Sequence, residues 1–319
     1  MNILIIGSGA IGIALGASMI SEGADVSFYA TENTAKMLRE HGIERIGLFK
    51  NLSYKPSEFN VYTSYDEIPE DTFDYVFITT KTTVNENVSE KLDKYCDILH
   101  SNAKIIIFQN GFGNDEYYLR YFSKNQVFSA RVITGFIRPQ KNISEITVHT
   151  APILIGSLQN VEISDDLKKI AQMINNSGIP ASTTECVEQY LLAKLLYNCA
   201  LNPLGALLGV CYGKLTENKY TVDIMNNIID EIFNVIEKLG YKTLWDDASS
   251  YREEFYLKLV PDTYNHTSSM LQDFNRKQHT EIDSLTGKII QLADIAGVDV
   301  KTNKVIYDLI KTRELSFEK

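Results

Sequence analysis

The chain has 319 residues, 44% of them hydrophobic, and a formal net charge of −10 at pH 7. This length has room for two domains, and the apolar fraction is sufficient for large cores. The acidic balance and the absence of a basic run argue against a nucleic-acid partner. No membrane span is expected either, because the longest apolar stretch, residues 193–213, contains Lys194, Asn198, Asn202 and Pro203.

Cysteine and histidine usage predicts neither disulfides nor a metal site. The four cysteines form no C-x-x-C pair, and none of the five histidines lies at a metal-ligand spacing. We therefore expect reduced thiols, as in a cytoplasmic protein. Met1 leads directly into an apolar strand, which argues against a signal peptide.

The first twenty residues predict a dinucleotide-binding site. Residues 3–6 form a short run of branched apolar side chains, as in a strand buried on both faces, and residues 13–20 have the spacing of a helix. Between them lies a G-x-G-x-x-G motif made of Gly7, Ser8, Gly9, Ala10, Ile11 and Gly12. Its glycines permit a tight turn, a close approach of backbone to a pyrophosphate, and close packing of helix on strand. The helix N-terminus offers free N–H groups to the phosphates. The alternative is a glycine-rich turn without a ligand.

Further elements follow in an α/β order. Strands are predicted at residues 25–29, 75–79, 104–108, 127–137, 146–155 and 180–184, and a helix at residues 165–176. From about residue 185 the chain has helical periodicity and little strand signal. We therefore predict an α/β protein, with a Rossmann-type NAD(P)-binding domain in residues 1–185 and a mostly α-helical substrate and catalytic domain in residues 186–319.

The residues after the second strand leave the choice of cofactor open. NAD enzymes commonly place an acidic residue there for the ribose hydroxyl, and NADP enzymes an arginine for the phosphate. Here no acid ends the strand and no arginine follows it. Thr31, Asn33 and Lys36 are candidate phosphate ligands, whereas Glu32 is a candidate for the ribose hydroxyl.

Two polar residues follow strands at the end where a ligand is expected. Lys81 comes after the strand at 75–79, and Asn110 follows the strand at 104–108. In open parallel sheets the ligand lies outside the carboxyl ends of the strands, so both are candidate site residues. The alternatives are a solvated loop lysine and ordinary Asn-Gly turn chemistry.

A second polar cluster lies in the middle of the chain. Lys194, Asn198 and Asn202 are spaced by four residues, so they share one face of an otherwise apolar helix. Such a stripe is costly when buried without partners and is expected where it faces a ligand. Pro203 is expected to end or kink this helix. The alternative is a lysine that extends to solvent, with asparagines bonded within the helix.

A third cluster lies near the C-terminus. On one helix Asp273, Lys277 and Glu281 would stack at intervals of four, with Ser269 one turn earlier. The alternative is a pair of ordinary surface ion pairs.

Four stretches in this order carry a family resemblance: GSGAIG, QNG, AKLLYNCALNP and SSMLQD…TEIDSLTG. Together they resemble the ketopantoate reductase (2-dehydropantoate 2-reductase) family over almost the whole chain. The resemblance implies a Rossmann-type domain followed by an α-helical domain, with the site in the cleft between them. It also implies NADPH-dependent reduction of 2-dehydropantoate to pantoate, in pantothenate biosynthesis.

The resemblance also implies roles by position. Lys194 corresponds to the proton donor to the ketone oxygen, and Glu281 to the acidic active-site residue. The implied substrate residues are Asn110, Asn198, Asn202, Ser269 and Asp273, and the implied cofactor residues, besides the glycine motif, are Thr31, Lys81, Asn110 and Glu281. At Thr31 many members carry an arginine for the 2′-phosphate of NADPH, so NADH stays an alternative cofactor.

Two alternatives remain for function. The first is a dehydrogenase of similar fold that acts on another 2-keto acid. The second is a non-catalytic NAD(P)-binding regulatory protein, which has no need for Lys194 together with Glu281. A homodimer through the helical domain is a further hypothesis.

Overall fold

The computed structural model describes residues 1–317 and divides into two compact units. The first, here called the sheet unit, comprises Met1–Gln109 and Asn114–Val187. The second, the helical unit, comprises the chain from Glu188 onward together with the short segment Asn110–Gly113. This segment therefore belongs with helices that follow it by about eighty residues or more in the sequence, and not with the strand that it follows directly.

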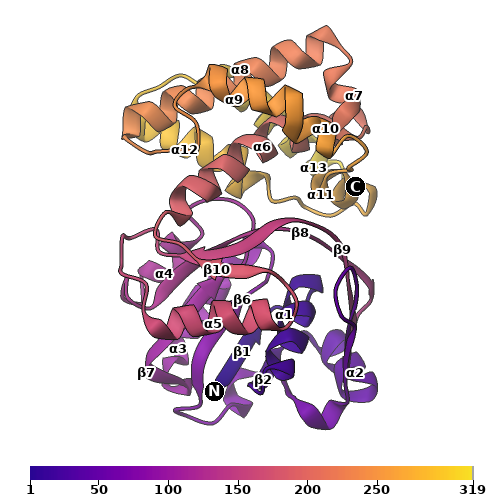
Figure 1. Cartoon of the computed structure of the whole chain (residues 1–319), viewed down its shortest axis with the longest axis vertical. Coiled ribbons are helices and arrows are strands. Elements are labelled where there is room, and N and C mark those ends of the chain that lie inside the picture. The colour runs from indigo at the N-terminus through magenta and orange to yellow at the C-terminus, as the bar shows by residue number, and fades with distance from the viewer. Residues whose placement is uncertain (318–319) are drawn as a thin grey trace. The chain divides into compact units, whose positions relative to one another are not determined.

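The sheet unit is built on one sheet of ten strands within the described residues (Figure 1). Its order is β4-β3-β9-β8-β7-β6-β1-β2-β5, with β10 beside β9. Only β3 with β4 and β8 with β9 pair antiparallel. The strands are β1 (Asn2–Ile6), β2 (Asp25–Tyr29), β3 (Ile43–Gly47), β4 (Leu52–Tyr54), β5 (Asn60–Tyr62), β6 (Phe73–Ile78), β7 (Leu99–Ile107), β8 (Val127–Gln140), β9 (Ile143–Gly156) and β10 (Ala181–Thr183).

Helices cover both faces of this sheet, because alternate side chains of a strand point to opposite faces. Ile3 and Ile5 of β1 share a core with α1 (Ala10–Ser21) and α5 (Asp165–Asn176). Leu4 and Ile6 share a second core with α3 (Asn85–Lys94) and α4 (Asp115–Leu119). These four residues of β1 are at most 1% exposed, as predicted for a strand buried on both faces.

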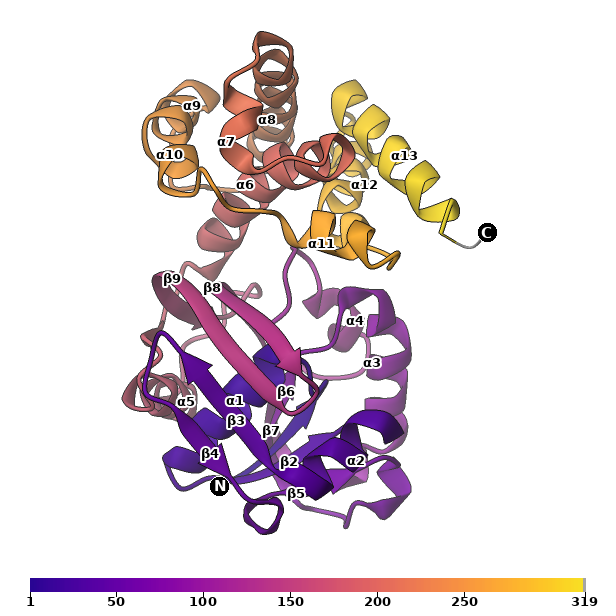
Figure 2. The same cartoon turned by 90° about the vertical axis from the view of Figure 1, so that its right-hand side faces the viewer.

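The strands β8 and β9 form a long hairpin that extends the sheet (Figure 2). Each has fourteen residues, and their pairing shifts register at several points. The hairpin joins β3 to the rest of the sheet, since β9 pairs with β3 and β8 with β7. The connection after β2 also contains α2 (Glu32–His41).

The helical unit contains no strand within its described residues. The helices α8, α12 and α13 contact one another, and their buried side chains include Ile232, Ile289 and Ile310. The helices are α6 (Val187–Leu208, which begins at the last residue of the sheet unit), α7 (Tyr212–Thr216), α8 (Lys219–Leu239), α9 (Ala248–Glu254), α10 (Val260–Asp262), α11 (Ser269–Asn275), α12 (Thr286–Ala296) and α13 (Lys301–Leu315).

The long helix α6 passes through Pro203 and ends only at Leu208. Of the two predicted effects of this proline, an end of the helix is therefore wrong, whereas a kink stays a prediction. Buried neighbours such as Leu196, Leu201 and Leu204 hold both halves in the core, and this packing outweighs the backbone hydrogen bond that proline cannot make. The helix α6 is long and apolar enough to cross a membrane, but 67% of its apolar window is buried inside the protein.

The structure confirms the predicted strands and the helix at 165–176, and it adds three short strands, β3 to β5, that the sequence pattern did not reveal. The α/β class and the change to helices after about residue 185 are also as predicted.

Candidate functional site

The glycine motif forms the turn between β1 and α1. Gly7 has a φ of +105°, and a Cβ there would lie 2.6 Å from the backbone nitrogen of Thr80. A Cβ on Gly12 would lie 2.1 Å from the carbonyl oxygen of Gly7. The Thr79 hydroxyl donates a 2.5 Å hydrogen bond to that same carbonyl. Both positions therefore exclude any larger residue, which holds α1 close to β1 and β6.

The middle of this turn is open. Nothing lies within 4 Å of the place that a Cβ on Gly9 would occupy. Gly9 is also the N-cap of α1, with no side-chain cap and no acidic residue in the first turn. The first N–H groups of a helix have no partner inside it. The residues present therefore fit the pyrophosphate of a dinucleotide.

The end of β2 presents hydroxyl groups. Thr31 is the N-cap of α2, and its hydroxyl lies 3.4 Å from that of Thr34. Thr31, Glu32 and Asn33 are exposed. Lys36 lies one turn further on and is directed along the helix, 3.9 Å from the carboxylate of Glu40.

Lys81 lies in the sheet unit, exposed at the N-cap of a short 3-10 turn after β6. This position agrees with its predicted place at the carboxyl end of that strand.

The structure brings three of the predicted site residues together inside the helical unit. Lys194 on α6 donates a 2.5 Å hydrogen bond to Oδ1 of Asn110. The Nδ2 of Asn110 donates a 3.4 Å hydrogen bond to Oε2 of Glu281. An ammonium can only donate and a carboxylate accepts, so this orientation of the Asn110 amide satisfies both neighbours. Asn110 thus bridges a cation and an anion through its two ends.

The turn that carries Asn110 is held against the loop that carries Glu281. Gly111 has a φ of +98°, and a Cβ there would lie 2.5 Å from the carbonyl oxygen of Ser284. The N–H of Phe112 donates to that carbonyl at 3.3 Å. The Phe112 ring also makes an edge contact with Tyr241. The glycine is therefore required both by its backbone conformation and by this close approach.

The loop of Glu281 is anchored from its other side by Glu314 on α13. This carboxylate is 2% exposed and accepts hydrogen bonds from the backbone N–H and the hydroxyl of Thr280, both at 2.7 Å. Lys311 lies 3.4 Å from it. The residue next to Glu281 is thus held by a buried, charge-assisted pair of hydrogen bonds.

The two asparagines on α6 differ in their surroundings. Asn198 lies one turn after Lys194 and is 9% exposed. Asn202 is 4% exposed, and its Oδ1 accepts a 2.5 Å hydrogen bond from the hydroxyl of Tyr212. Burial raises the pKa of the Tyr212 hydroxyl, which therefore stays a donor. The Asn202 side-chain oxygen is thus engaged with its own unit.

The third predicted cluster is not a helical stripe. Helix α11 ends at Asn275, and Lys277 has a φ of +53°, so Asp273, Lys277 and Glu281 do not stack on one helix. The chain turns there because the amides of Arg276 and Gln278 both bond back to the carbonyl of Asp273. This prediction is wrong, although Glu281 still reaches Asn110.

The start of α11 is capped by Ser268, which is buried and accepts from the N–H of Leu271 at 3.0 Å. The predicted site residue Ser269 follows it and is exposed, and Asp273 is 9% exposed on the same helix. The SSMLQD motif therefore combines an ordinary helix cap with one exposed serine.

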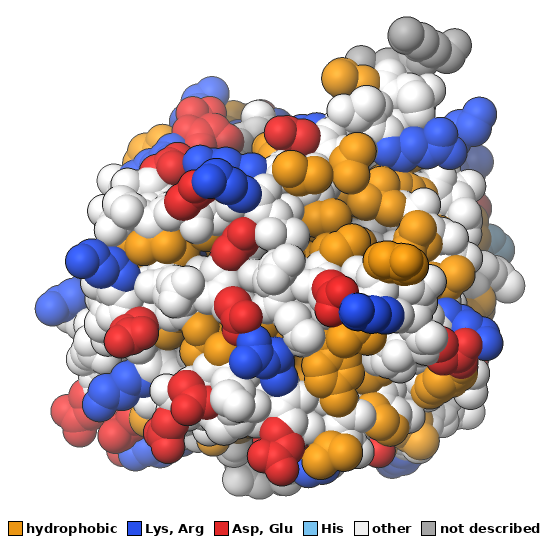
Figure 3. Space-filling view, turned by 90° about the horizontal axis from the view of Figure 1, so that it is seen from above, with side chains coloured by type: hydrophobic (Ala, Val, Ile, Leu, Met, Phe, Trp, Pro, Cys, Tyr) orange, Lys and Arg blue, Asp and Glu red, His pale blue; other side chains and the backbone are white. Residues whose placement is uncertain are grey.

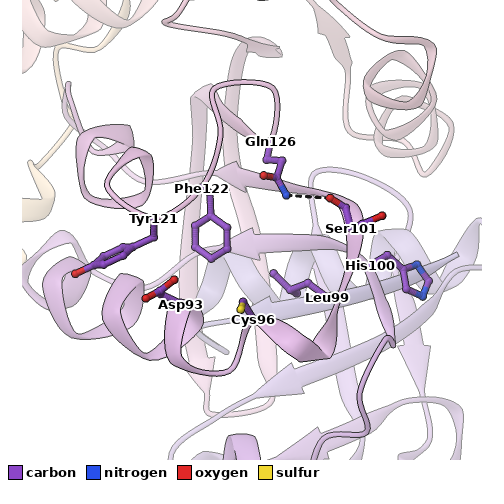
Figure 4. A pocket seen from close by; sticks show the side chains of 8 residues that line it. All are labelled: Asp93, Cys96, Leu99, His100, Ser101, Tyr121, Phe122 and Gln126. Carbon is purple, nitrogen blue, oxygen red and sulfur yellow. Dashed lines mark hydrogen bonds between the residues drawn. The ribbon is translucent and has the colours of Figure 1, made fainter.

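A separate cavity of about 230 Å³ lies in the sheet unit (Figure 4). Leu99, His100 and Ser101 line it from the start of β7, and Gln126 donates to the carbonyl of Ser101 at 3.5 Å. The cavity is thus at the amino end of β7, whereas the ligands of open parallel sheets lie at the carboxyl ends. It does not contain the residues described above.

Comparisons with known proteins bear on both parts of the chain. The model of the ketopantoate reductase PanE/ApbA family matches residues 3–160, and the model of its C-terminal part matches residues 187–314. A 2-dehydropantoate 2-reductase of Aquifex aeolicus is 36% identical over 99% of this chain and 97% of its own length.

Two solved structures show the same fold. A PanE/ApbA family ketopantoate reductase from Ralstonia eutropha has a TM-score of 0.85 at 22% identity, with both chains fully covered. The ternary structure of D-mandelate dehydrogenase with NADH and anilino(oxo)acetate also has a TM-score of 0.85, at 19% identity, and covers 100% of this chain and 99% of the other.

The family models match most of the chain, and the Aquifex relative is 36% identical over nearly the full length of both chains. The chain therefore belongs to the ketopantoate reductase family.

Proposed function

We propose that the protein reduces 2-dehydropantoate to pantoate, with NADPH as the reductant, as a step of pantothenate biosynthesis. The observation that carries this proposal is the bridge from Lys194 through Asn110 to Glu281, in a chain that belongs to the ketopantoate reductase family. A protein that only bound a dinucleotide would need the glycine turn and not this bridge.

The proposed division of labour follows the two parts of the chain. Residues 1–185 bind the cofactor through the glycine turn, whose open Gly9 and uncapped helix suit a pyrophosphate. The cofactor supplies the hydride when it is bound. Residues 186–319, with Asn110, provide the groups that act on the keto acid.

Lys194 is the proposed general acid. As a hydride reaches the ketone carbon, negative charge develops on the ketone oxygen. The ammonium of Lys194 stabilises this charge and donates a proton to the oxygen, which yields the hydroxyl of the product. The lysine is left as a neutral amine and regains its proton from solvent.

Asn110 and Glu281 are proposed to orient the lysine. The Asn110 oxygen fixes the Lys194 ammonium at 2.5 Å, and Glu281 fixes the amide from its other end. Asn198, Ser269 and Asp273 are proposed to contact the substrate, whereas the bond from Tyr212 favours a positioning role for Asn202.

Thr31 and Lys81 are proposed as further cofactor contacts, together with Asn110 and Glu281. Thr31, Asn33 and Lys36 are the groups after β2 that would hold a phosphorylated ribose, and no acidic residue ends that strand. NADPH is therefore the proposed cofactor in preference to NADH.

The first experiment follows the loss of reduced nicotinamide absorbance with purified protein and 2-dehydropantoate, in parallel with NADPH and NADH. Oxidation of NADPH is the expected result. Oxidation of NADH alone would keep the reaction and overturn the proposed cofactor. If neither cofactor is oxidised although cofactor binding is shown separately, 2-dehydropantoate is excluded as the substrate. A panel of other 2-keto acids would then be assayed.

The proposed catalytic role has its own variant. Lys194→Ala should abolish turnover and leave cofactor binding nearly intact. If both are lost together, the change has affected folding and not the proton donor.

The proposed setting is the cytoplasm, with a small-molecule keto acid as the substrate. We also propose a homodimer through the helical unit. Figure 3 shows apolar side chains gathered over part of the face that it draws. The helical unit has exposed large apolar residues, among them Leu257, Ile295 and Val305. Light scattering after gel filtration gives the mass that tests this.

A further inference from the structure

The choice between NADPH and NADH depends on the groups around the start of α2. In a βαβ unit with a glycine turn, the adenosine ribose lies at the carboxyl end of the second strand. Here this strand, β2, ends at Tyr29, and α2 begins after Thr31. A dinucleotide bound in this way would place the ribose hydroxyl that carries the phosphate in NADPH near Thr31 and Thr34.

We infer that Arg138, on the far strand β8, is the residue that recognises the 2′-phosphate. This inference rests on the proposed use of NADPH and assigns the selectivity to one side chain. Sequence order conceals it, because Arg138 follows Thr34 by more than one hundred residues.

The hairpin places Arg138 at the start of α2. Its Nη2 donates to the hydroxyl of Thr34 at 3.3 Å and to the backbone carbonyl of Lys141 at 2.6 Å. The Thr34 hydroxyl in turn lies 3.4 Å from that of Thr31. A guanidinium and two hydroxyls thus converge, and the turn end of the hairpin is seen beside α2 in Figures 1 and 2.

Among the residues that the structure describes, the Arg138 guanidinium has no anionic partner. Its hydrogen bonds go to a hydroxyl and a carbonyl, and no carboxylate in residues 1–317 forms an ion pair with it. Partial burial lowers the pKa of Arg138. Arg has five N–H donors in a planar fork, so most of them stay available for a phosphate.

Other charged groups nearby serve this role less well. Lys36 is mostly exposed and is directed toward Glu40. Arg39 donates to the carbonyl of Val61 and lies in the last turn of α2. Glu32, the first residue of α2, is exposed and would oppose a phosphate if it turned inward, so a cation is needed there.

The buried Arg45 provides a contrast in the same unit. It is 1% exposed and bonds to Ser18, Ser177 and the carbonyl of Lys50. Both of its terminal nitrogens donate to groups of the sheet unit. Arg138 instead keeps its side chain partly in solvent, beside Thr34 near the start of α2.

The test compares two ligands that differ only in the phosphate, 2′,5′-ADP and 5′-AMP, by calorimetry on the full chain. We expect the wild type to prefer 2′,5′-ADP. Arg138→Ala should weaken binding of 2′,5′-ADP by roughly 10- to 100-fold, because charge-assisted hydrogen bonds are lost. Binding of 5′-AMP should not change.

Three further variants separate charge from structure. Arg138→Gln keeps hydrogen-bonding capacity without charge and should lose the preference, whereas Arg138→Lys should retain part of it. Lys141→Ala is the matched control, because Lys141 is an exposed cation directly after the end of β8, three residues from Arg138. This variant keeps the backbone carbonyl that Arg138 uses and should bind both ligands as the wild type does. Thermal unfolding without ligand shows that each variant is folded.

The outcomes distinguish the two proposals. If the wild type binds 2′,5′-ADP no better than 5′-AMP, NADPH use and the role of Arg138 both fail. If the wild type prefers 2′,5′-ADP and both Arg138→Ala and Arg138→Gln keep that preference, only the assignment of Arg138 fails. A loss of preference in Lys36→Ala alone would move the assignment to that lysine.

Discussion

The substitution Asn110→Ala tests whether the bridge between Lys194 and Glu281 supports catalysis. It removes the 2.5 Å hydrogen bond from Lys194 and the 3.4 Å hydrogen bond to Glu281. A hydrogen bond that involves a charged group contributes about 1.5–3 kcal/mol. If this free energy positions the proton donor in the transition state, the turnover number should fall roughly 10- to 100-fold, since about 1.4 kcal/mol is a factor of ten in rate.

The assay is steady-state reduction of 2-dehydropantoate, with kcat and KM measured separately. The dissociation constant of NADPH, measured in parallel by fluorescence, separates loss of lysine positioning from loss of a cofactor contact. Positioning alone predicts a fall in kcat with a nearly constant dissociation constant.

The matched control is Asn226→Ala. Asn226 also lies in the helical unit and also accepts one hydrogen bond, from the hydroxyl of Tyr256 at 2.9 Å. Its loss should lower stability by about 0.5–1.5 kcal/mol, as expected for one neutral hydrogen bond, and leave kcat unchanged. A kcat of Asn110→Ala within about threefold of the wild type, a difference below ~1 kcal/mol, would refute the reasoning.

Three other substitutions have defined outcomes. Gly7→Ala forces a Cβ to 2.6 Å from a backbone nitrogen at a φ of +105°. We expect this variant to lose cofactor binding and, because of a strain of about 1–3 kcal/mol, to melt at a lower temperature. An NADPH fluorescence titration that matches the wild type would contradict this. Glu314→Gln replaces the buried charged acceptor of two Thr280 hydrogen bonds. The free energy of unfolding, measured in urea, should fall by about 1.5–3 kcal/mol, and kcat should fall as well. Equal stability of variant and wild type would show that charge is not needed there. The hydrogen bond with Asp74 raises the pKa of His100 above its ordinary 6.5, so its stabilisation is complete below pH 6.5 and is lost as pH rises through the folded pKa. The melting-temperature gap between the wild type and His100→Gln should therefore be wider on the acidic side of that pKa than on the alkaline side, and a gap independent of pH would exclude this linkage.

The glycine turn was predictable because its physics is local. A short apolar strand, a turn with positive φ and a helix that packs closely are decided by neighbouring residues, and Gly7 and Gly12 meet these demands in the structure. The stripe of Lys194 and Asn198 on α6 followed from helical periodicity in the same way.

The local sequence pattern gave wrong predictions where the folded structure determines where a helix ends. Pro203 stays inside α6 because the surrounding core holds the helix on both sides. Residues 273–281 have helical spacing, yet the chain turns after Asn275, where amides bond back to the carbonyl of Asp273. Spacing alone does not distinguish a long helix from a short helix and a turn.

By itself, the sequence determined the class of the fold, the glycine turn and the residue types that a keto acid reductase needs. Only the tertiary structure decided which of them meet. Asn110 follows a strand of the sheet unit but joins Lys194 and Glu281, and Arg138 reaches Thr34 across a hairpin. The reason is physical: hydrogen bonds act over about 3 Å, whereas residues separated by some eighty to one hundred and seventy positions are brought to that distance only by the packing of the whole chain.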